Sequence, residues 1–204
     1  MAGDDLWESF SRRTVFGFHG NTGSRIADAE EYGFHRDGLP GDWLGSGWYF
    51  WQDAPARAWQ WADHVVALEL RRNPDGPQAE PMVLIAELEY TEGWVDLIDV
   101  GTWFAILERA ARILEGLDLL PDQASDLASS VLHERDYTVI ELTLDILRRE
   151  GVTADAVRCA FIEGIPVTED SAIYDKTHVQ IAVRNPAIIL NHSRMDRRNL
   201  DIRR

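Results

Sequence analysis

The chain has 204 residues, of which 45% are apolar, and a formal net charge of −15. A chain of this length and composition can bury one sizeable core, which predicts a single domain over residues 1–204. The strong negative charge argues against a protein that grips long nucleic acid, because phosphate contacts need clustered Lys and Arg.

The start of the chain, MAGDDLWESFSRR, lacks the basic-then-apolar pattern of a secretory signal, and no apolar run approaches the roughly 18 residues of a membrane span. These features predict a cytoplasmic protein with no membrane partner. Cys159 is the only cysteine, so we expect a small buried strand residue rather than a disulfide or a thiolate cluster. The histidines and carboxylates show no metal-ligand spacing, so no metal is expected.

The first half of the chain predicts strands that alternate with helices. Residues 14–18 predict a strand that Gly20 ends, and SRIADAEEYG (24–33) predicts a short helix that stops at Gly33. HRDGLPGDWLGSG (35–47) is typical of a loop, and WYFW (48–51) of a short aromatic strand. DAPARAWQWADHVV (53–66) predicts a helix with Asp53 as its N-cap and Pro55 in its first turn.

The second half predicts a different order of elements. After the polar stretch 71–80, PMVLIAELEY (81–90) and WVDLID (94–99) predict strands, and apolar periodicity predicts helices over 102–116 and 137–150. VRCAFIEG (157–164), the loop PVTEDSAIYDKT (166–177) and HVQIAVRNPAIIL (178–190) predict the last strands before a charged tail. Regular strand–helix alternation is missing, which indicates an α+β fold.

A His-Gly pair stands at the end of the first predicted strand, in VFGFHGNTGSRI (15–26). Gly20 would let a ligand approach the backbone closely, while the imidazole of His19 could bond a polar group beside it. Taken alone, the pair is more simply explained by structure, since a neighbouring carbonyl satisfies many partly buried histidines.

A second signal follows about thirty residues later, where DWLGSGWYFW (42–51) again sets small residues against aromatics. Such concentrated aromatics build cores or line pockets for planar ligands. The series of a His-Gly strand, a Gly-x-Tyr-aromatic strand and a helix bearing a further aromatic resembles the ADP-ribosyltransferase superfamily of diphtheria-toxin and poly(ADP-ribose) polymerase type. The resemblance covers Val15 to Ala62 well and Ala160 to Leu190 more weakly.

The resemblance implies a split mixed β-sheet core flanked by helices, with NAD as the substrate. It assigns His19 to a ribose hydroxyl of the adenosine half and the Gly20 backbone to the nicotinamide carboxamide. It assigns Tyr49 to stacking on the nicotinamide ring, and Asn21 and Gly47 to the surrounding NAD site.

The second stacking aromatic of such a site should lie on the helix after Tyr49. The spacing falls one residue short at Trp59 and one residue long at Trp61, so both remain candidates. Aromatic faces suit the chemistry, because nicotinamide is a flat cationic ring that leaves as a neutral molecule. Cleavage of its glycosidic bond gives an oxocarbenium-like ribose that the site must stabilise.

The family normally supplies a glutamate for that task at the start of a late strand, and Gln180 stands at the matching position. The implied triad is therefore His19, Tyr49 and Gln180. An amide can accept a hydrogen bond from a ribose hydroxyl but brings no negative charge. A unit charge at about 4 Å is worth roughly 4 kcal/mol, or nearly a thousandfold in rate.

Three explanations for Gln180 are open: a highly reactive acceptor, a carboxylate from Glu163 or Glu169, or a fold that binds NAD without turnover. Gln180 could also be an ordinary polar strand residue. His178 should point to the same face of its strand as Gln180, at the rim of the site or on the surface.

The leading hypothesis is an NAD-dependent ADP-ribosyltransferase that modifies a macromolecular acceptor, as bacterial toxin-like members of the family do. The resemblance then implies a neutralising antitoxin protein in the producing cell, and an acidic loop, PVTEDSAIYD, that helps to choose the target. The alternative is a module that binds NAD or ADP-ribose without catalysis. A third hypothesis, a relative of the RNA 2′-phosphotransferases, lacks the basic residues expected for phosphate handling.

Overall fold

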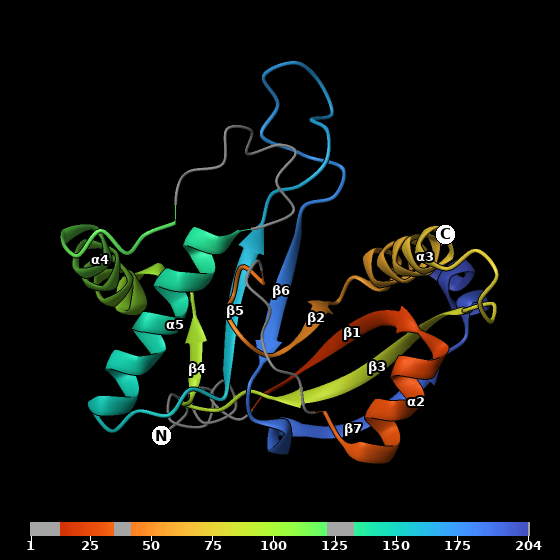
Figure 1. The fold of residues 1–204 in the computed structure, drawn as a ribbon, viewed down its shortest axis with the longest axis horizontal. Helices are drawn as coiled ribbons and strands as arrows, with labels where there is room; N and C mark the ends of the chain where they lie inside the picture. The colour runs from red at the N-terminus through yellow and green to blue at the C-terminus, as the bar shows by residue number, and fades with distance from the viewer. Residues whose placement is uncertain (1–12, 35–41, 122–132, 204) are drawn as a thin grey trace, which may run out of the picture.

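A mixed sheet of seven strands forms the centre of the described chain, which comprises residues 13–34, 42–121 and 133–203 of a computed structural model (Figure 1). The strand order is β4-β5-β6-β2-β1-β3-β7; β4 and β5 run parallel, and the other neighbouring pairs are antiparallel. The strands are β1 (Thr14–Thr22), β2 (Trp48–Gln52), β3 (Pro81–Glu89), β4 (Trp94–Asp96), β5 (Ala156–Phe161), β6 (His178–Val183) and β7 (Ile189–Met195). The fold is therefore mixed α and β, as expected.

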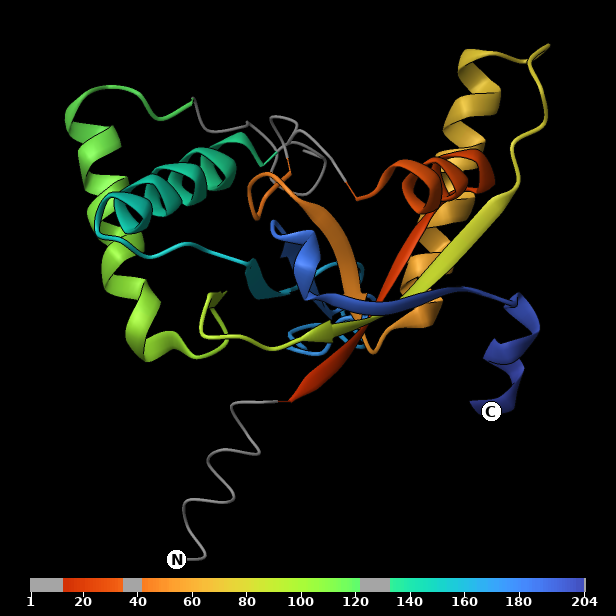
Figure 2. The same cartoon turned by 90° about the horizontal axis from the view of Figure 1, so that it is seen from below.

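Four α-helices flank this sheet among the described residues, at its two ends (Figures 1 and 2). They are α2 (Gly23–Tyr32), α3 (Pro55–Arg72), α4 (Val100–Gly116) and α5 (Glu134–Arg149), with short 3-10 segments η1 (Pro186–Ile188) and η2 (Arg197–Arg203) near the C-terminus. Helices α2 and α3 pack on β1 and β3, while α4 packs on α5 and β4. No helix in the described ranges is long and apolar enough to cross a bilayer.

The two faces of the sheet carry different helices. Phe18 of β1 packs with Ala58 and Trp59 of α3, whereas Leu84 of β3 packs with Ile26 of α2 on the opposite face. Helix α5 lies on the same face as α3, at the other end, where its Leu144 packs on Val157, Ala182 and the half-buried Tyr49. The centre of this face, over β2 and β6, therefore lies between α3 and α5.

Most expected elements are present, but several boundaries differ, and two of these differences bear on the site. Strand β1 continues through Gly20 to Thr22, because β3 pairs with it along its whole length. The N-cap of α3 is Ala54 and makes no side-chain cap bond; Asp53 instead has φ 51° in the turn between β2 and α3. The expectation of Asp53 as N-cap was therefore wrong. Residues 35–41 of the expected loop lie outside the described residues.

The segment between β5 and β6 projects beyond the ends of its strands (Figure 1). It folds on itself through a bridge between Pro166 and Tyr174 and through backbone bonds such as Val167 N–H to the Ile173 carbonyl, 2.9 Å. Its two ends meet where the Lys176 N–H donates to the Glu163 carbonyl. This is the loop that the sequence suggested as a target-selecting segment.

Candidate functional site

Strands β1 and β2 pair over a short stretch and then separate. The paired residues are Gly17 with Gln52 and Phe18 with Trp51, although β1 runs on to Thr22. Past this point the Nδ1–H of His19 donates to the backbone carbonyl of Tyr49 at 2.8 Å. A side chain thus takes the place of a ladder bond at the point where the sheet splits.

His19 is held in one tautomer by its partners. Because a carbonyl can only accept, Nδ1 carries the proton, and Nε2 accepts from the Asn21 side-chain amide at 3.3 Å. The ring is 3% exposed and lies 4.6 Å from the Trp48 ring and 5.9 Å from the Phe50 ring, measured between centroids. Both ring nitrogens of His19 therefore have hydrogen-bond partners, as a structural role would require. The side chain also faces the α2 side of the sheet.

Gly20 is required by the packing of α3. A Cβ built on Gly20 would lie 1.9 Å from the Ala58 carbonyl oxygen. The Phe16 carbonyl accepts from the Asp53 N–H at 3.0 Å, so alternate residues Phe16, Phe18 and Gly20 direct their backbone groups toward β2. At Gly20 this edge lies beyond the last paired residues.

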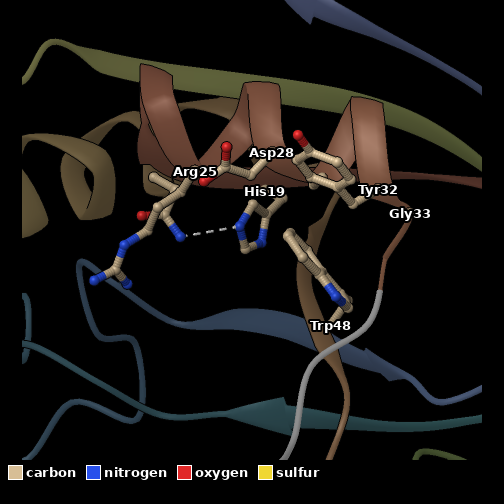
Figure 3. A pocket seen from close by; sticks show the side chains of 8 residues that line it. His19, Arg25, Asp28, Tyr32, Gly33 and Trp48 are labelled. Atoms are coloured by element: carbon tan, nitrogen blue, oxygen red, sulfur yellow. Dashed lines mark hydrogen bonds between the residues drawn. The ribbon is translucent and has the colours of Figure 1, made fainter.

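A cavity of about 320 Å³ opens beside His19 and Asn21, between the end of β1, helix α2 and Trp48 (Figure 3). Helix α2 contributes its lining from one face, because the residues recur at three and four positions. These residues are Arg25, Asp28, Ala29 and Tyr32, followed by the C-capping Gly33. The cavity thus combines a guanidinium, a carboxylate, an imidazole and two aromatic rings.

The hydroxyl of Tyr49 is fixed by the loop that precedes β2. It accepts from the Leu44 N–H and donates to the Gly45 carbonyl, both at 2.8 Å. The Tyr49 side chain points toward α5, away from His19, since the ring contacts of His19 are with the alternate residues Trp48 and Phe50. The structure therefore joins His19 to the backbone of Tyr49 and not to its ring.

An ion pair anchors this loop to α5. Glu141 Oε1 accepts from the Ser46 N–H at 2.6 Å and from Arg184 at 2.8 Å, and Arg184 also donates to the Ser46 carbonyl at 2.7 Å. Burial raises the pKa of Glu141, but the bonds from Arg184 and Ser46 outweigh it and leave the pKa below its ordinary value. Gly45, with φ 79°, leaves no room for a Cβ beside Glu141.

Gln180 lies on β6 opposite Trp51, on the same face as Tyr49 and two residue pairs further along. Its Oε1 accepts from the indole N–H of Trp43 at 2.6 Å. Because an indole nitrogen only donates, this bond fixes which end of the amide faces Trp43. Cys159 pairs with Gln180 from β5, half-buried rather than fully buried as expected, and burial raises the pKa of its thiol.

The structure separates the two candidate stacking tryptophans. Trp59 is 5% exposed, packs in the core under α3, and has the Arg197 guanidinium 5.0 Å from its ring centroid. Trp61 is 37% exposed, and its ring lies 5.9 Å from that of Trp51. Of the two residues, only Trp61 offers an accessible face.

The remaining expected residues have clear surroundings. Gly47 lies against β6, where a Cβ would meet the Val183 carbonyl oxygen at 2.8 Å. The lack of a side chain at Gly47 therefore lets the backbone pack closely on the sheet. Glu163 pairs with Arg57 of α3 at 2.6 Å, near His178 and hence near the β6 strand of Gln180. Glu169 is exposed in the projecting loop.

Several lining residues were missed by sequence reasoning. The repeat of Arg25, Asp28 and Tyr32 along one face of a predicted helix that begins directly after His-Gly could have indicated them. Trp48 follows from strand alternation beside Tyr49. The contact between Trp43 and Gln180 joins residues 137 positions apart, and no local pattern indicates it.

Comparison of the chain with protein-family models, with curated proteins and with solved structures found no match.

Proposed function

We propose that this chain is an NAD-dependent ADP-ribosyltransferase that cleaves the nicotinamide glycosidic bond and transfers ADP-ribose to a macromolecular acceptor. The observation that carries the proposal is the split between β1 and β2, where His19 bridges to the Tyr49 carbonyl and the backbone edge at Gly20 extends past the pairing. This arrangement supports the proposal, because the resemblance in sequence pattern implies a split sheet.

The cavity beside His19 suits the adenosine half of NAD. Its volume of about 320 Å³ falls at the lower end of the range for ligand pockets, which fits half of a dinucleotide. A ribose hydroxyl that donates to His19 Nε2 would replace the long bond from Asn21. Trp48 and Tyr32 offer aromatic surface for adenine, and Arg25 offers positive charge for the diphosphate.

The nicotinamide half would lie on the other side of the β1 edge. The N–H and C=O of Gly20 match the acceptor and donor of a carboxamide. The exposed face of Trp61, with the Trp51 ring beside it, supplies the aromatic surface for a flat cationic ring. The dinucleotide would therefore cross the strand edge, with its two halves on opposite faces of the sheet.

Gln180 would act on the ribose that links the halves. Its Oε1 has a second lone pair beside the one that Trp43 occupies, and this pair can accept from a ribose hydroxyl. An oxygen held in place by an indole N–H needs no reorientation as positive charge develops at the anomeric carbon. Orientation then supplies acceleration that the missing carboxylate does not.

One observation favours a second candidate, a module that binds NAD or ADP-ribose without turnover. Gln180 is uncharged and already bonded to Trp43, and the nearby Glu163 is engaged by Arg57. If none of the described residues offers Gln180 a free carboxylate, the site would still bind the dinucleotide but would stabilise the oxocarbenium ion poorly.

The toxin-like role is part of the proposal. The loop between β5 and β6 would contact the macromolecular target, and an antitoxin protein would neutralise the chain in the cytoplasm of its own cell. The acidic residues Glu169, Asp170 and Asp175 of this loop favour a basic surface on the target.

The test is incubation of the purified chain with NAD that carries labelled adenylate, with and without cell lysate. Release of nicotinamide, lost in Tyr49→Ala and in His19→Phe, supports the transferase. Binding of NAD without release supports the module. Absence of both would remove NAD from the function of the chain. Mass spectrometry of labelled lysate components then identifies the acceptor.

A further inference from the structure

His178 is a buried imidazole that the proposed reaction has not used. It is 6% exposed, at the start of β6 and on the same strand face as Gln180. Its Nδ1–H donates to the Lys176 carbonyl at 2.6 Å, so Nε2 carries a lone pair. Among the described residues, Nε2 is buried and has no hydrogen-bond partner.

Trp51 places an unpartnered hydrogen-bond donor near this acceptor. The Trp51 ring is 4% exposed and lies 6.3 Å from the His178 ring, centroid to centroid, and its indole N–H is also buried without a partner. An unsatisfied buried polar group costs about 1–3 kcal/mol, so a pair of neighbouring ones indicates a partner that binds there. Phe161, 5.5 Å from His178, closes the apolar side.

The two atoms define the chemistry of that partner. One oxygen at hydrogen-bond distance, about 2.9 Å, from each of the two nitrogens could serve both of them. It must donate to His178 and accept from Trp51. A hydroxyl does both, whereas a carboxylate has no proton for His178 and a guanidinium has no acceptor for Trp51.

We infer that Trp51 and His178 form the acceptor subsite, that the acceptor is a hydroxyl group, and that His178 takes its proton. This inference rests on the proposed transferase activity. The bond from the anomeric carbon to nicotinamide breaks, and nicotinamide leaves with the electron pair. The hydroxyl oxygen forms the new bond to that carbon, and its proton moves to Nε2, which gives an O-glycoside and an imidazolium.

The surroundings of His178 fit a proton acceptor. Burial lowers its pKa, the bond to the Lys176 carbonyl raises it, Arg57 lowers it and Glu163 raises it, with a net pKa below the ordinary value. The ring is therefore neutral at neutral pH and able to accept a proton. The Lys176 carbonyl and Glu163 would stabilise the imidazolium once it forms.

In the test, the chain is incubated with NAD and with methanol and acetate together. The ratio of methyl-ADP-ribose to acetyl-ADP-ribose is then measured. Methanol has a proton to lose and acetate has none. The wild type should favour methanol, and His178→Asn, which keeps a donor for Lys176 but no base, should lower the methyl-to-acetyl ratio at least tenfold. Trp51→Phe should lower it less. The ratio does not depend on how much of a variant is folded.

His64→Asn is the matched control, since His64 is exposed beside Trp61 and should leave the ratio unchanged. A wild type that makes both products equally, or a ratio unchanged in His178→Asn, overturns the inference and leaves the transferase standing. If the wild type releases no nicotinamide from NAD with any nucleophile, the proposed function itself fails, and this inference fails with it.

Discussion

The Nδ1–H of His19 and the backbone carbonyl of Tyr49 lie 2.8 Å apart across the split between β1 and β2. This bond holds the two strands at a fixed separation where their ladder has ended. It also sets the tautomer that leaves Nε2 as an acceptor toward the cavity. Strand geometry and the proposed ligand recognition thus depend on the same ring.

His19→Phe tests this double dependence. Phenylalanine keeps the contacts with Trp48 and Phe50 but removes both ring nitrogens. We expect a loss of about 1–2 kcal/mol in the free energy of unfolding, because the Tyr49 carbonyl loses a donor. NAD affinity should fall at least tenfold. Urea denaturation and calorimetric titration measure the two effects; unchanged affinity would separate His19 from the ligand.

Gly20→Ala should destabilise the chain strongly. The new methyl group would collide with the Ala58 carbonyl and push α3 from the sheet, at a cost of about 3 kcal/mol. Gly116→Ala is the control, because its Cβ would meet nothing within 4 Å in α4 and should be neutral or slightly stabilising. Thermal unfolding of both variants is the measurement, and similar melting temperatures would contradict the packing described here.

Trp43→Phe should affect activity more than stability. It removes the N–H that fixes Gln180, so nicotinamide release should fall about tenfold while the free energy of unfolding falls by about 1 kcal/mol. Trp94→Phe removes a comparable indole bond, to the Glu89 carbonyl in a distant strand. It should cost similar stability and leave release unchanged. Gln180→Ala itself should reduce transfer by an order of magnitude or more.

Glu141 makes stability depend on acid pH. Its pKa in the folded chain lies below the unfolded value, so its stabilisation is present above about pH 4.3 and is lost as pH falls through the folded-state pKa. Glu141→Gln should therefore be less stable than the wild type by about 2 kcal/mol at pH 7. The difference should shrink below pH 4. Urea denaturation across pH 3–7 measures it, and a constant difference would refute a role for the charge.

The two tryptophans of α3 should respond differently to truncation. Trp59→Ala removes a core ring and should destabilise by about 3–5 kcal/mol. Trp61→Ala should leave stability nearly unchanged and weaken NAD binding through loss of stacking. Denaturation and titration distinguish them. A Trp61→Ala variant with full NAD affinity would exclude this face from the nicotinamide subsite.

The elements of the fold followed largely from local patterns. The periodicity of β3, the capping Gly33 and the apolar stripes of α4 and α5 each depend on neighbours in the sequence. The end of β1 was misjudged, because Gly20 is usually a breaker and its pairing with Val83 comes from a strand sixty residues away. The prediction of Asp53 as the N-cap of α3 was wrong because Asp53 lies in the turn that precedes the helix.

The site was less predictable than the fold. His19 and its neighbour Asn21 were selected through the family resemblance, and both line the cavity. Distinguishing Trp59 from Trp61 requires the exposed fraction of each ring, which the spacing of residues in the sequence does not give. The attachment of Gln180 to Trp43, and of their loop to Glu141 and Arg184, depends on contacts between distant segments.

The position of β6 has a consequence for synthesis. This strand lies between β5 and β2 in the middle of the sheet, yet both of these neighbours precede it in the chain. Until residues 178–183 emerge, β2 lacks a neighbour on that side and Gln180 is absent. Such long-range pairing folds slowly, in milliseconds to seconds. In the proposed function, a nascent chain without this strand would have no complete dinucleotide site, and activity would begin only after residues 178–183 have emerged.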